Sequence, residues 1–249
     1  MRNQLPVRST QFSFSLSKVA IALLCCAFSI EPLFAQELDW THYGNDQGNT
    51  RYQNIDQINP SNVSQLKPAW TFHTGVLPSA HPRLKLEMTP LVIKGVMYIT
   101  SGIDDVYAVN PATGVQLWRY NPATDMPNLS TVSICCGRDN RGASYGDGLI
   151  FDARLDSNLV ALNAKTGAVV WKTKVDLISN GSAMTLAPQF VVTAAGVHEV
   201  LVGVTGGEYG IRGHLDAYAA ATGKFLWRFY TTNPATWAGN SYLHGGASI

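Results

Sequence analysis

Two adjacent cysteines lie in the stretch of this 249-residue chain where chemically reactive side chains are most concentrated. Residues 133–142 combine Cys135 and Cys136 with Arg138 and Arg141 and with two glycines. The Cα atoms of neighbouring residues are about 3.8 Å apart, so a bridge between these two cysteines would close a small, strained ring. A ring of this kind needs a functional reason, and the rest of the chain must supply it.

The first 35 residues have the pattern of a secretory signal peptide. Basic residues precede an apolar run over 19–28, and Ala35 stands just before a polar segment. The apolar run is shorter than the ~20 residues that a membrane-spanning helix needs. We therefore expect cleavage near Ala35, export to the periplasm, and a folded domain over residues 36–249.

Export changes the number of cysteines in the mature chain. Cys25 and Cys26 would leave with the signal peptide, so that Cys135 and Cys136 remain. An oxidising compartment permits disulfides, and a bond between the two neighbours is the leading option within the chain. A pair of buried free thiols is the alternative, and the residues alone leave it open.

The composition favours a β-rich protein without a nucleic-acid surface. The chain has 18 basic and 17 acidic residues and a formal net charge of +1, whereas nucleic-acid binding requires a clear basic excess. Glycine, proline and tryptophan are frequent, with 22, 12 and 6 copies, and no long helical pattern is present. The sequence also contains no Walker loop, no Rossmann glycine fingerprint and no Cys-x-x-Cys-His haem motif.

A short cassette recurs three times and sets the fold class. In each copy an alanine stands shortly before Thr-Gly, and a tryptophan follows the glycine by four positions, at Trp118, Trp171 and Trp227. Trp70 is a degenerate earlier copy. The spacing slightly exceeds the roughly 40–50 residues of a propeller blade. Four short strands per unit predict an all-β propeller; a β-sandwich would explain the strands but not the cassette.

Taken together, these features resemble the quinoproteins, the family of alcohol and methanol dehydrogenases that depend on pyrroloquinoline quinone (PQQ). The resemblance runs from Trp40 to the end of the chain and includes the cassettes, the cysteine pair, and residues 86–90, 185–188 and 205–213. It implies an eight-bladed propeller, of which about the first four blades are present. The general-base aspartate would lie beyond Ile249, so we expect no catalytic residue here and an inactive fragment.

The resemblance also implies the cofactor site. In the family a vicinal disulfide lies against one face of the quinone, which would explain the strain at Cys135 and Cys136. Arg141 matches the arginine that binds a cofactor carboxylate, and Glu87 matches a glutamate that contacts the cofactor in its plane. Arg138 has no such match. The remaining cofactor-binding residues that the resemblance implies are Thr185, Thr205, Gly206 and Gly207.

Glu208 matches the glutamate that binds the active-site cation of the family. A hard cation such as Ca²⁺ prefers oxygen ligands, and a lanthanide is the alternative ion. Without the family, a salt bridge from Glu208 to the nearby Arg212 would be the ordinary role of this carboxylate. The resemblance therefore implies that Glu208 is a metal ligand.

The implied activity is oxidation of a primary alcohol to an aldehyde, by hydride transfer to PQQ beside a bound cation. The implied partners are a small alcohol substrate and a cytochrome c that accepts electrons, and association with a membrane is compatible with the sequence. The oligomeric state is not indicated. Two alternatives remain open: a non-catalytic propeller scaffold of the outer-membrane assembly type, and a PQQ-dependent sugar or polyol dehydrogenase.

Overall fold

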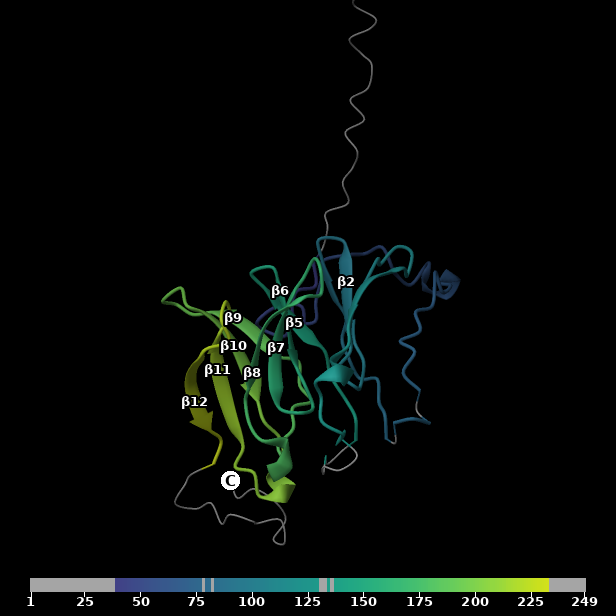
Figure 1. Cartoon of the computed structure of the whole chain (residues 1–249). Helices are drawn as coiled ribbons and strands as arrows, with labels where there is room; N and C mark the ends of the chain where they lie inside the picture. Colours follow the sequence, from purple (N-terminus) through teal and green to yellow (C-terminus); the bar gives the residue numbers. More distant parts are fainter. Residues whose placement is uncertain (1–38, 78, 82, 130–133, 135–136, 233–249) are drawn as a thin grey trace, which may run out of the picture. The chain divides into compact units, whose positions relative to one another are not determined.

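The computed structural model describes residues 39–77, 79–81, 83–129, 134 and 137–232. Within them, three four-stranded antiparallel sheets follow one another along the chain (Figure 1). The first comprises β1 (Leu91–Ile93), β2 (Val96–Thr100), β3 (Val106–Val109) and β4 (Gln116–Tyr120). The second comprises β5 (Ala143–Gly146), β6 (Leu149–Ala153), β7 (Asn158–Asn163) and β8 (Val169–Lys174). The third comprises β9 (Gln189–Val192), β10 (His198–Gly203), β11 (His214–Ala219) and β12 (Phe225–Tyr230).

Helical structure in the described part of the chain is limited to single 3-10 turns. These are η1 (Val63–Gln65), η2 (Pro122–Thr124), η4 (Ile178–Asn180) and η5 (Gly207–Tyr209). Among the described residues, no helix has both the length and the apolar character needed to cross a bilayer.

Each sheet has the strand order of a propeller blade. The strands pair in chain order, so that β1, β5 and β9 form one edge of their sheets and β4, β8 and β12 form the other. The sheets meet through their first strands, because β5 contacts both β1 and β9 (Figure 1). The predicted all-β propeller architecture is therefore confirmed, with three blades within the described residues.

Three tryptophans join successive repeats in the same way. Nε1 of Trp118 donates to the carbonyl oxygen of Ala164 at 3.0 Å, and Nε1 of Trp171 donates to that of Ala220 at 2.9 Å. Trp70 repeats this contact with Pro111 at 2.9 Å. Residues 69–75 form no strand, yet Trp70 still docks as an earlier copy of the cassette should.

The glycine of each cassette makes room for the docked ring. A Cβ atom on Gly167 would lie 2.6 Å from the ring of Trp118, which is closer than real contacts allow. Gly167 also has a φ of 72°, a turn conformation that glycine adopts without steric cost. The Thr-Gly turn and the tryptophan of the preceding repeat therefore form one packing unit.

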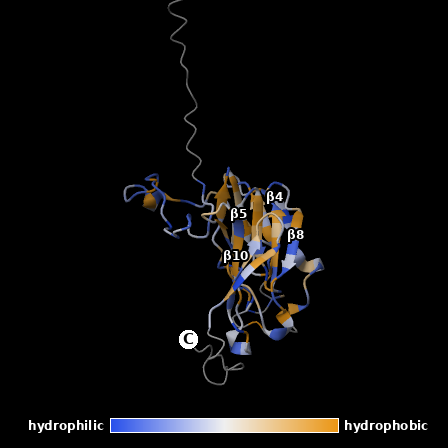
Figure 2. Cartoon of the chain, turned by 90° about the vertical axis from the view of Figure 1, so that its left-hand side faces the viewer, coloured by the Kyte–Doolittle hydropathy of each residue, from blue (hydrophilic) through white to orange (hydrophobic). Residues whose placement is uncertain are grey.

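The second sheet is buried on both faces. Ile150 and Val160 pack with β1–β3 of the first sheet, whereas Phe151 and Leu159 pack with β10 and β11 of the third. This alternation follows from the two-residue period of a strand. Figure 2 shows hydrophobic residues, in orange, concentrated along the strands. Each large apolar side chain buried in this way contributes about 1.5–3 kcal/mol to stability.

Candidate functional site

Three equivalent segments, one from each repeat, meet at one end of the sheets. Residues 83–89 lead into β1, 137–142 lead into β5, and 181–187 lead into β9. The amide of Lys85 donates to the carbonyl oxygen of Arg138 at 2.9 Å, and the amide of Arg141 donates to that of Thr185 at 3.0 Å. Because each segment occupies the same place in its repeat, the blade arrangement brings residues far apart in sequence side by side.

The guanidinium group of Arg141 lies at the centre of this meeting point. Its Nη1 donates to the hydroxyl of Thr185 at 2.7 Å, and its Nη2 donates to Oε2 of Glu87 at 3.0 Å. Nη2 also lies 2.8 Å from Oδ2 of Asp139. Lys85 pairs with the other oxygen of Glu87 at 3.3 Å. The Arg141 side chain keeps 38% of its surface exposed, so this cationic centre is open to solvent.

Asn140 fixes the segment that carries Arg141. Its Nδ2 donates to Asp104 at 2.9 Å and to Asp152 at 2.8 Å, and its Oδ1 accepts the amide of Gly142 at 2.9 Å. Asp104 belongs to the β2–β3 turn and Asp152 to β6, so one side chain links two blades. All three side chains are buried. Asn140 is therefore a positioning residue for Arg141.

Asp104 and Asp152, the two carboxyl groups that Asn140 contacts, have little positive charge nearby to balance them if both are ionised. Burial raises the pKa of Asp152 to about 7, although Asn140 and Arg154 oppose this shift. Burial and the neighbouring Asp152 also raise the pKa of Asp104 well above its ordinary value. Two buried carboxyl groups close together cannot both ionise without a large cost in free energy.

A second arginine, Arg154, begins the β6–β7 turn and is completely buried. Its Nη2 and Nε donate to the two oxygens of Asp156 at 2.6 and 3.1 Å. Its Nη1 donates to the hydroxyl of Tyr120 at 2.9 Å and to Asp125 at 3.0 Å. Burial raises the pKa of Tyr120 to about 12, so this hydroxyl stays neutral. These contacts leave Arg154 no exposed face for a ligand.

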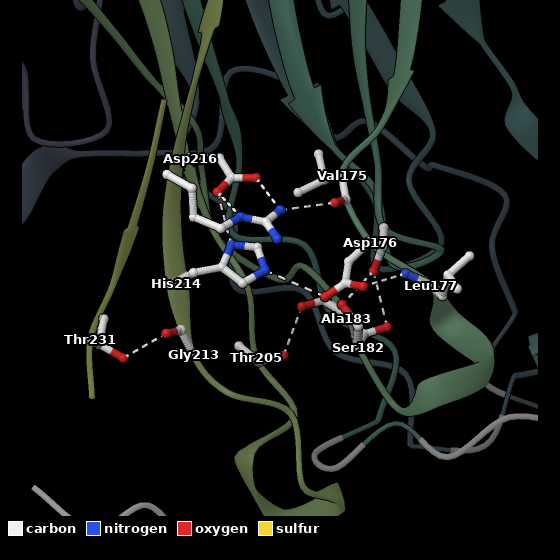
Figure 3. Close-up of polar contacts among 12 residues, drawn as sticks. Val175, Asp176, Leu177, Ser182, Ala183, Thr205, Gly213, His214, Asp216 and Thr231 are labelled. Atoms are coloured by element: carbon white, nitrogen blue, oxygen red, sulfur yellow. Dashed lines mark hydrogen bonds and ion pairs between the residues drawn. The ribbon is translucent and has the colours of Figure 1, made fainter. Parts of the chain in front are cut away.

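The β10–β11 connection is a longer loop that contains η5, whereas the equivalent β2–β3 and β6–β7 connections are tight turns. Thr205 opens it and pairs with Ala183, to which its amide and its hydroxyl donate at 2.9 and 2.8 Å (Figure 3). Gly206 has a φ of 123°, and a Cβ there would lie 2.4 Å from the carbonyl oxygen of Gly181. A Cβ on Gly207 would meet no atom within 4 Å. The loop therefore packs tightly at Gly206 and is open at Gly207.

His214 anchors the far end of this loop, between two carboxylates (Figure 3). Its Nδ1 lies 2.9 Å from Oδ1 of Asp216, and its Nε2 lies 3.4 Å from Oδ2 of Asp176. Arg228 also pairs with Asp216, at 2.7 Å. Burial would raise the pKa of Asp216, but the hydrogen bonds from Arg228 and His214 prevail and lower it to about 2. Asp216 thus stays ionised and holds β11 in place.

Glu208 lies in η5, half-buried, and makes no hydrogen bond or ion pair with any described residue. Arg212 instead donates to the carbonyl oxygen of Thr232 and lies 3.9 Å from the ring centre of Tyr230. Glu208 therefore does not form the salt bridge with Arg212 that would be its ordinary role. Among the described residues, no group of three or more His, Cys, Asp or Glu side chains could hold a metal ion.

The predicted site residues fall into three sets. Direct side-chain contacts join Glu87, Arg141 and Thr185. The second set, which lies on the neighbouring loop, is Thr205, Gly206, Gly207 and Glu208. Cys135 and Cys136, with the disulfide predicted between them, lie outside the described residues.

Sequence reasoning missed three residues of this site: Lys85, Asp139 and Asn140. Asp139 and Asn140 stand directly before Arg141, so their position offered a signal. Their burial and their contacts with other blades became visible only in the structure.

The described residues fit an anionic planar cofactor such as PQQ. Arg141 presents an exposed guanidinium group, which suits a carboxylate, and Thr185 adds a hydroxyl beside it. The open backbone at Gly207 leaves space for close approach. For the cation, Glu208 supplies one carboxylate that has no other described partner.

Comparison with known proteins identifies relatives of the chain. Residues 40–247 match the family described as PQQ, glucose/ethanol/alcohol dehydrogenase, β-propeller domain. The chain is 40% identical over 204 residues to methanol dehydrogenase (cytochrome c) subunit 1 of Methylorubrum extorquens, covering 79% of this chain and 30% of that protein. It is 41% identical over 192 residues to the lanthanide-dependent methanol dehydrogenase of the same organism, covering 76% and 30%.

A solved structure agrees with these matches. A europium-containing methanol dehydrogenase superposes with a TM-score of 0.70 at 36% sequence identity. The match covers 82% of this chain and 34% of that one. The chain thus spans about a third of the length of these relatives.

Proposed function

The chain belongs to the family of PQQ glucose/ethanol/alcohol dehydrogenase β-propeller domains, and from this premise we propose that it forms part of the cofactor site of an alcohol dehydrogenase. The proposed reaction is the oxidation of a primary alcohol to an aldehyde. The observation that carries the proposal is that Arg141 contacts both Glu87 and Thr185. These three residues come from three different repeats. Relatives named as methanol dehydrogenases support the substrate class.

In this proposal Arg141 is the anchor for a cofactor carboxylate. A guanidinium group binds a carboxylate through two parallel N–H donors, which fixes the orientation of the cofactor as well as its position. Thr185 holds one edge of the guanidinium and offers its hydroxyl to the same region. Glu87 neutralises Arg141 from its exposed side and would contact the cofactor in its plane.

The neighbouring loop would complete the rim of the site. Thr205 is held in place by Ala183, and Gly206 and Gly207 let the backbone approach the cofactor closely. Cys135 and Cys136 would cover one face of the ring if they form the predicted bridge. Glu208 would bind Ca²⁺ or a lanthanide, because its carboxylate is not engaged by any described residue.

When bound, PQQ supplies the two-electron acceptor for the hydride of the alcohol. A cation near its carbonyl oxygens would favour that transfer electrostatically. The relative named with cytochrome c supports a cytochrome c as the electron acceptor for the whole enzyme. The basic and apolar pattern of the first 35 residues supports export to the periplasm.

The test is the substitution Glu208→Gln, which removes the charge and keeps the size of the side chain. In protein expressed from the complete reading frame and loaded with PQQ and Ca²⁺ or La³⁺, the variant should lose cation and quinone together. Cation content by mass spectrometry and quinone absorbance measure both losses. The matched control is Glu199→Gln, which contacts Trp227 and should keep both. Unchanged cation content in Glu208→Gln would reject the metal role.

The same preparation separates the alternatives. A non-catalytic scaffold would bind no PQQ in either variant or in the wild type. A sugar or polyol dehydrogenase would bind PQQ and the cation but prefer a larger substrate.

A further inference from the structure

Glu208, the proposed cation ligand, is not held in place by contacts of its own side chain. It lies half-buried in η5, and its carboxylate makes no hydrogen bond or ion pair within the described part of the chain. A metal ligand binds tightly only when the surrounding structure fixes its position, most often through hydrogen bonds to the ligand. The position of Glu208 must therefore be fixed through the backbone of η5.

The loop that carries η5 is attached at both ends to one short segment, residues 176–183. This segment belongs to the connection between β8 and β9 and includes η4. Ala183 pairs with Thr205 at the start of the loop, through backbone hydrogen bonds of 2.9 and 3.3 Å (Figure 3). At the far end of the loop, Oδ2 of Asp176 lies 3.4 Å from Nε2 of His214 (Figure 3). The segment therefore sets where the loop begins and where it ends.

Gly181 supports the middle of the loop, between these two attachments. It ends η4 with a φ of 93°, a left-handed conformation that glycine adopts without steric cost. A Cβ atom on Gly181 would lie 2.6 Å from Cβ of Tyr209, which is closer than real contacts allow. A Cβ atom on Gly206 would likewise overlap the carbonyl oxygen of Gly181. Gly181 therefore packs against the loop on both sides of Glu208.

Even a methyl group at position 181 would have to displace η5. The atom that it would meet is Cβ of Tyr209, whose position is set by the backbone and cannot change by side-chain rotation. The amide of Tyr209 donates to the carbonyl oxygen of Gly206 at 2.9 Å, so the two contacts with Gly181 belong to one hydrogen-bonded turn. Glu208 lies inside this turn and would move with it.

We propose that Gly181 is a positioning residue of the cation site, because its lack of a side chain lets η5 pack where Glu208 can bind the ion. The proposal rests on the proposed function, since it needs Glu208 to bind the cation. It adds that residues 176–183, to which no ligand of the cation is assigned, control the affinity for the cation.

The test is Gly181→Ala, in protein expressed from the complete reading frame and loaded with PQQ. Calorimetric titration with Ca²⁺ should show an affinity that is lower by about tenfold to about a hundredfold, the usual loss when the support of a metal ligand is removed. Eu³⁺ as a probe ion supplies a second measurement. Its luminescence lifetime should shorten, because a water molecule would replace the displaced carboxylate oxygen.

Gly196→Ala is the matched control. Gly196 has a φ of 75°, and a Cβ atom there would meet no atom within 4 Å. This variant therefore introduces backbone strain of the same kind without the collision. It should keep the wild-type Ca²⁺ affinity and the wild-type Eu³⁺ lifetime.

The outcomes separate this proposal from the proposed function. If folded Gly181→Ala keeps the wild-type affinity and lifetime, or if Gly196→Ala loses them equally, the role of Gly181 is rejected and the cation site stands. If wild type binds no cation, the proposed metal role of Glu208 fails and this proposal fails with it.

Should Gly181→Ala not fold, as judged by circular dichroism, Tyr209→Gly decides the question. This variant removes the Cβ atom that packs against Gly181 and introduces no collision. It should weaken Ca²⁺ binding and shorten the Eu³⁺ lifetime, and unchanged values would overturn the proposal.

Discussion

Two arginines at the same end of the second sheet have opposite surroundings. Arg141 leads into β5 and Arg154 follows β6, and these strands pair so that Ala143 lies opposite Asp152. Arg154 is fully buried and its donors are taken up by protein groups. Arg141 keeps 38% of its side chain exposed and contacts an exposed glutamate, a threonine and the buried Asp139.

The difference shows how to tell a structural arginine from one that can bind a ligand. A buried guanidinium group with a complete set of acceptors would lose stability if a ligand displaced any of them. An exposed guanidinium group that pairs with an exposed carboxylate can exchange that carboxylate for another at small cost. We therefore propose that Arg154 stabilises the fold and that Arg141 binds an anion.

The strongest test of this comparison is Arg154→Ala. It leaves Asp156 buried without its charge partner, so the free energy of unfolding should fall by about 3–5 kcal/mol. Arg141→Ala is the matched comparison and should cost less, about 1–3 kcal/mol, because Arg141 and Glu87 are exposed and only Asp139 is buried. Chemical denaturation followed by tryptophan fluorescence measures both values. Equal losses in the two variants would contradict the comparison.

The pH dependence of stability tests the carboxyl groups between the two arginines. Because the pKa of Asp152 is raised to about 7 in the folded state, from an ordinary 3.8, folding takes up protons between these values. Its stabilising contribution is present below the unfolded pKa and is lost as pH rises through about 7. The slope is at most about 1.4 kcal/mol per pH unit for one proton.

Asp152→Asn should flatten this slope, whereas Asp56→Asn should leave it unchanged. Urea denaturation at several pH values gives the measurement. Asp216 affects stability in a different pH range. Its pKa is lowered to about 2, so its contribution to stability is lost only in stronger acid. Stability that rises between about pH 4 and about pH 7 would argue against a raised pKa at Asp152.

Asn140 stands directly before Arg141 and contacts Asp152 of β6, the strand that Arg154 follows. Asn140→Ala therefore also tests the comparison of the two arginines. The variant leaves Asp104 and Asp152 without their shared donor and frees the amide of Gly142. Stability should fall by about 1–3 kcal/mol, as expected for buried polar groups that lose a partner. PQQ affinity should also fall, since Arg141 follows directly. Asn54→Ala, at an exposed position, serves as the control, and an equal effect there would refute the positioning role.

Much of the fold could be predicted from the sequence because its signals are local and repeated. Trp118 and Trp171 pack on the Thr-Gly turns of the repeats that follow them and so fix the packing of successive blades. Both the tryptophans and the turns can be recognised in the sequence as a cassette. Trp70 was recognised as a docking copy, but its segment is irregular rather than a strand. The backbone conformation of the segment around Trp70 depends on contacts with residues outside its own repeat.

The candidate site could be predicted only in part, for a physical reason. Glu87, Arg141 and Thr185 were named through the family resemblance, and the structure joins them. The burial of Asp139, and the clamp formed by Asn140 on two blades, depend on long-range contacts that no local pattern encodes. Nor does the sequence distinguish the surroundings of Arg141 from those of Arg154.

The central claim is that Arg141 binds a carboxylate of PQQ. The most direct measurement compares the affinity of the protein for PQQ and for its trimethyl ester, in wild type and in Arg141→Ala. In wild type the free acid should bind about tenfold to about a hundredfold more tightly than the ester, and the advantage should shrink sharply in the variant. Equal affinities in wild type, or an advantage that survives intact in Arg141→Ala, would contradict the account.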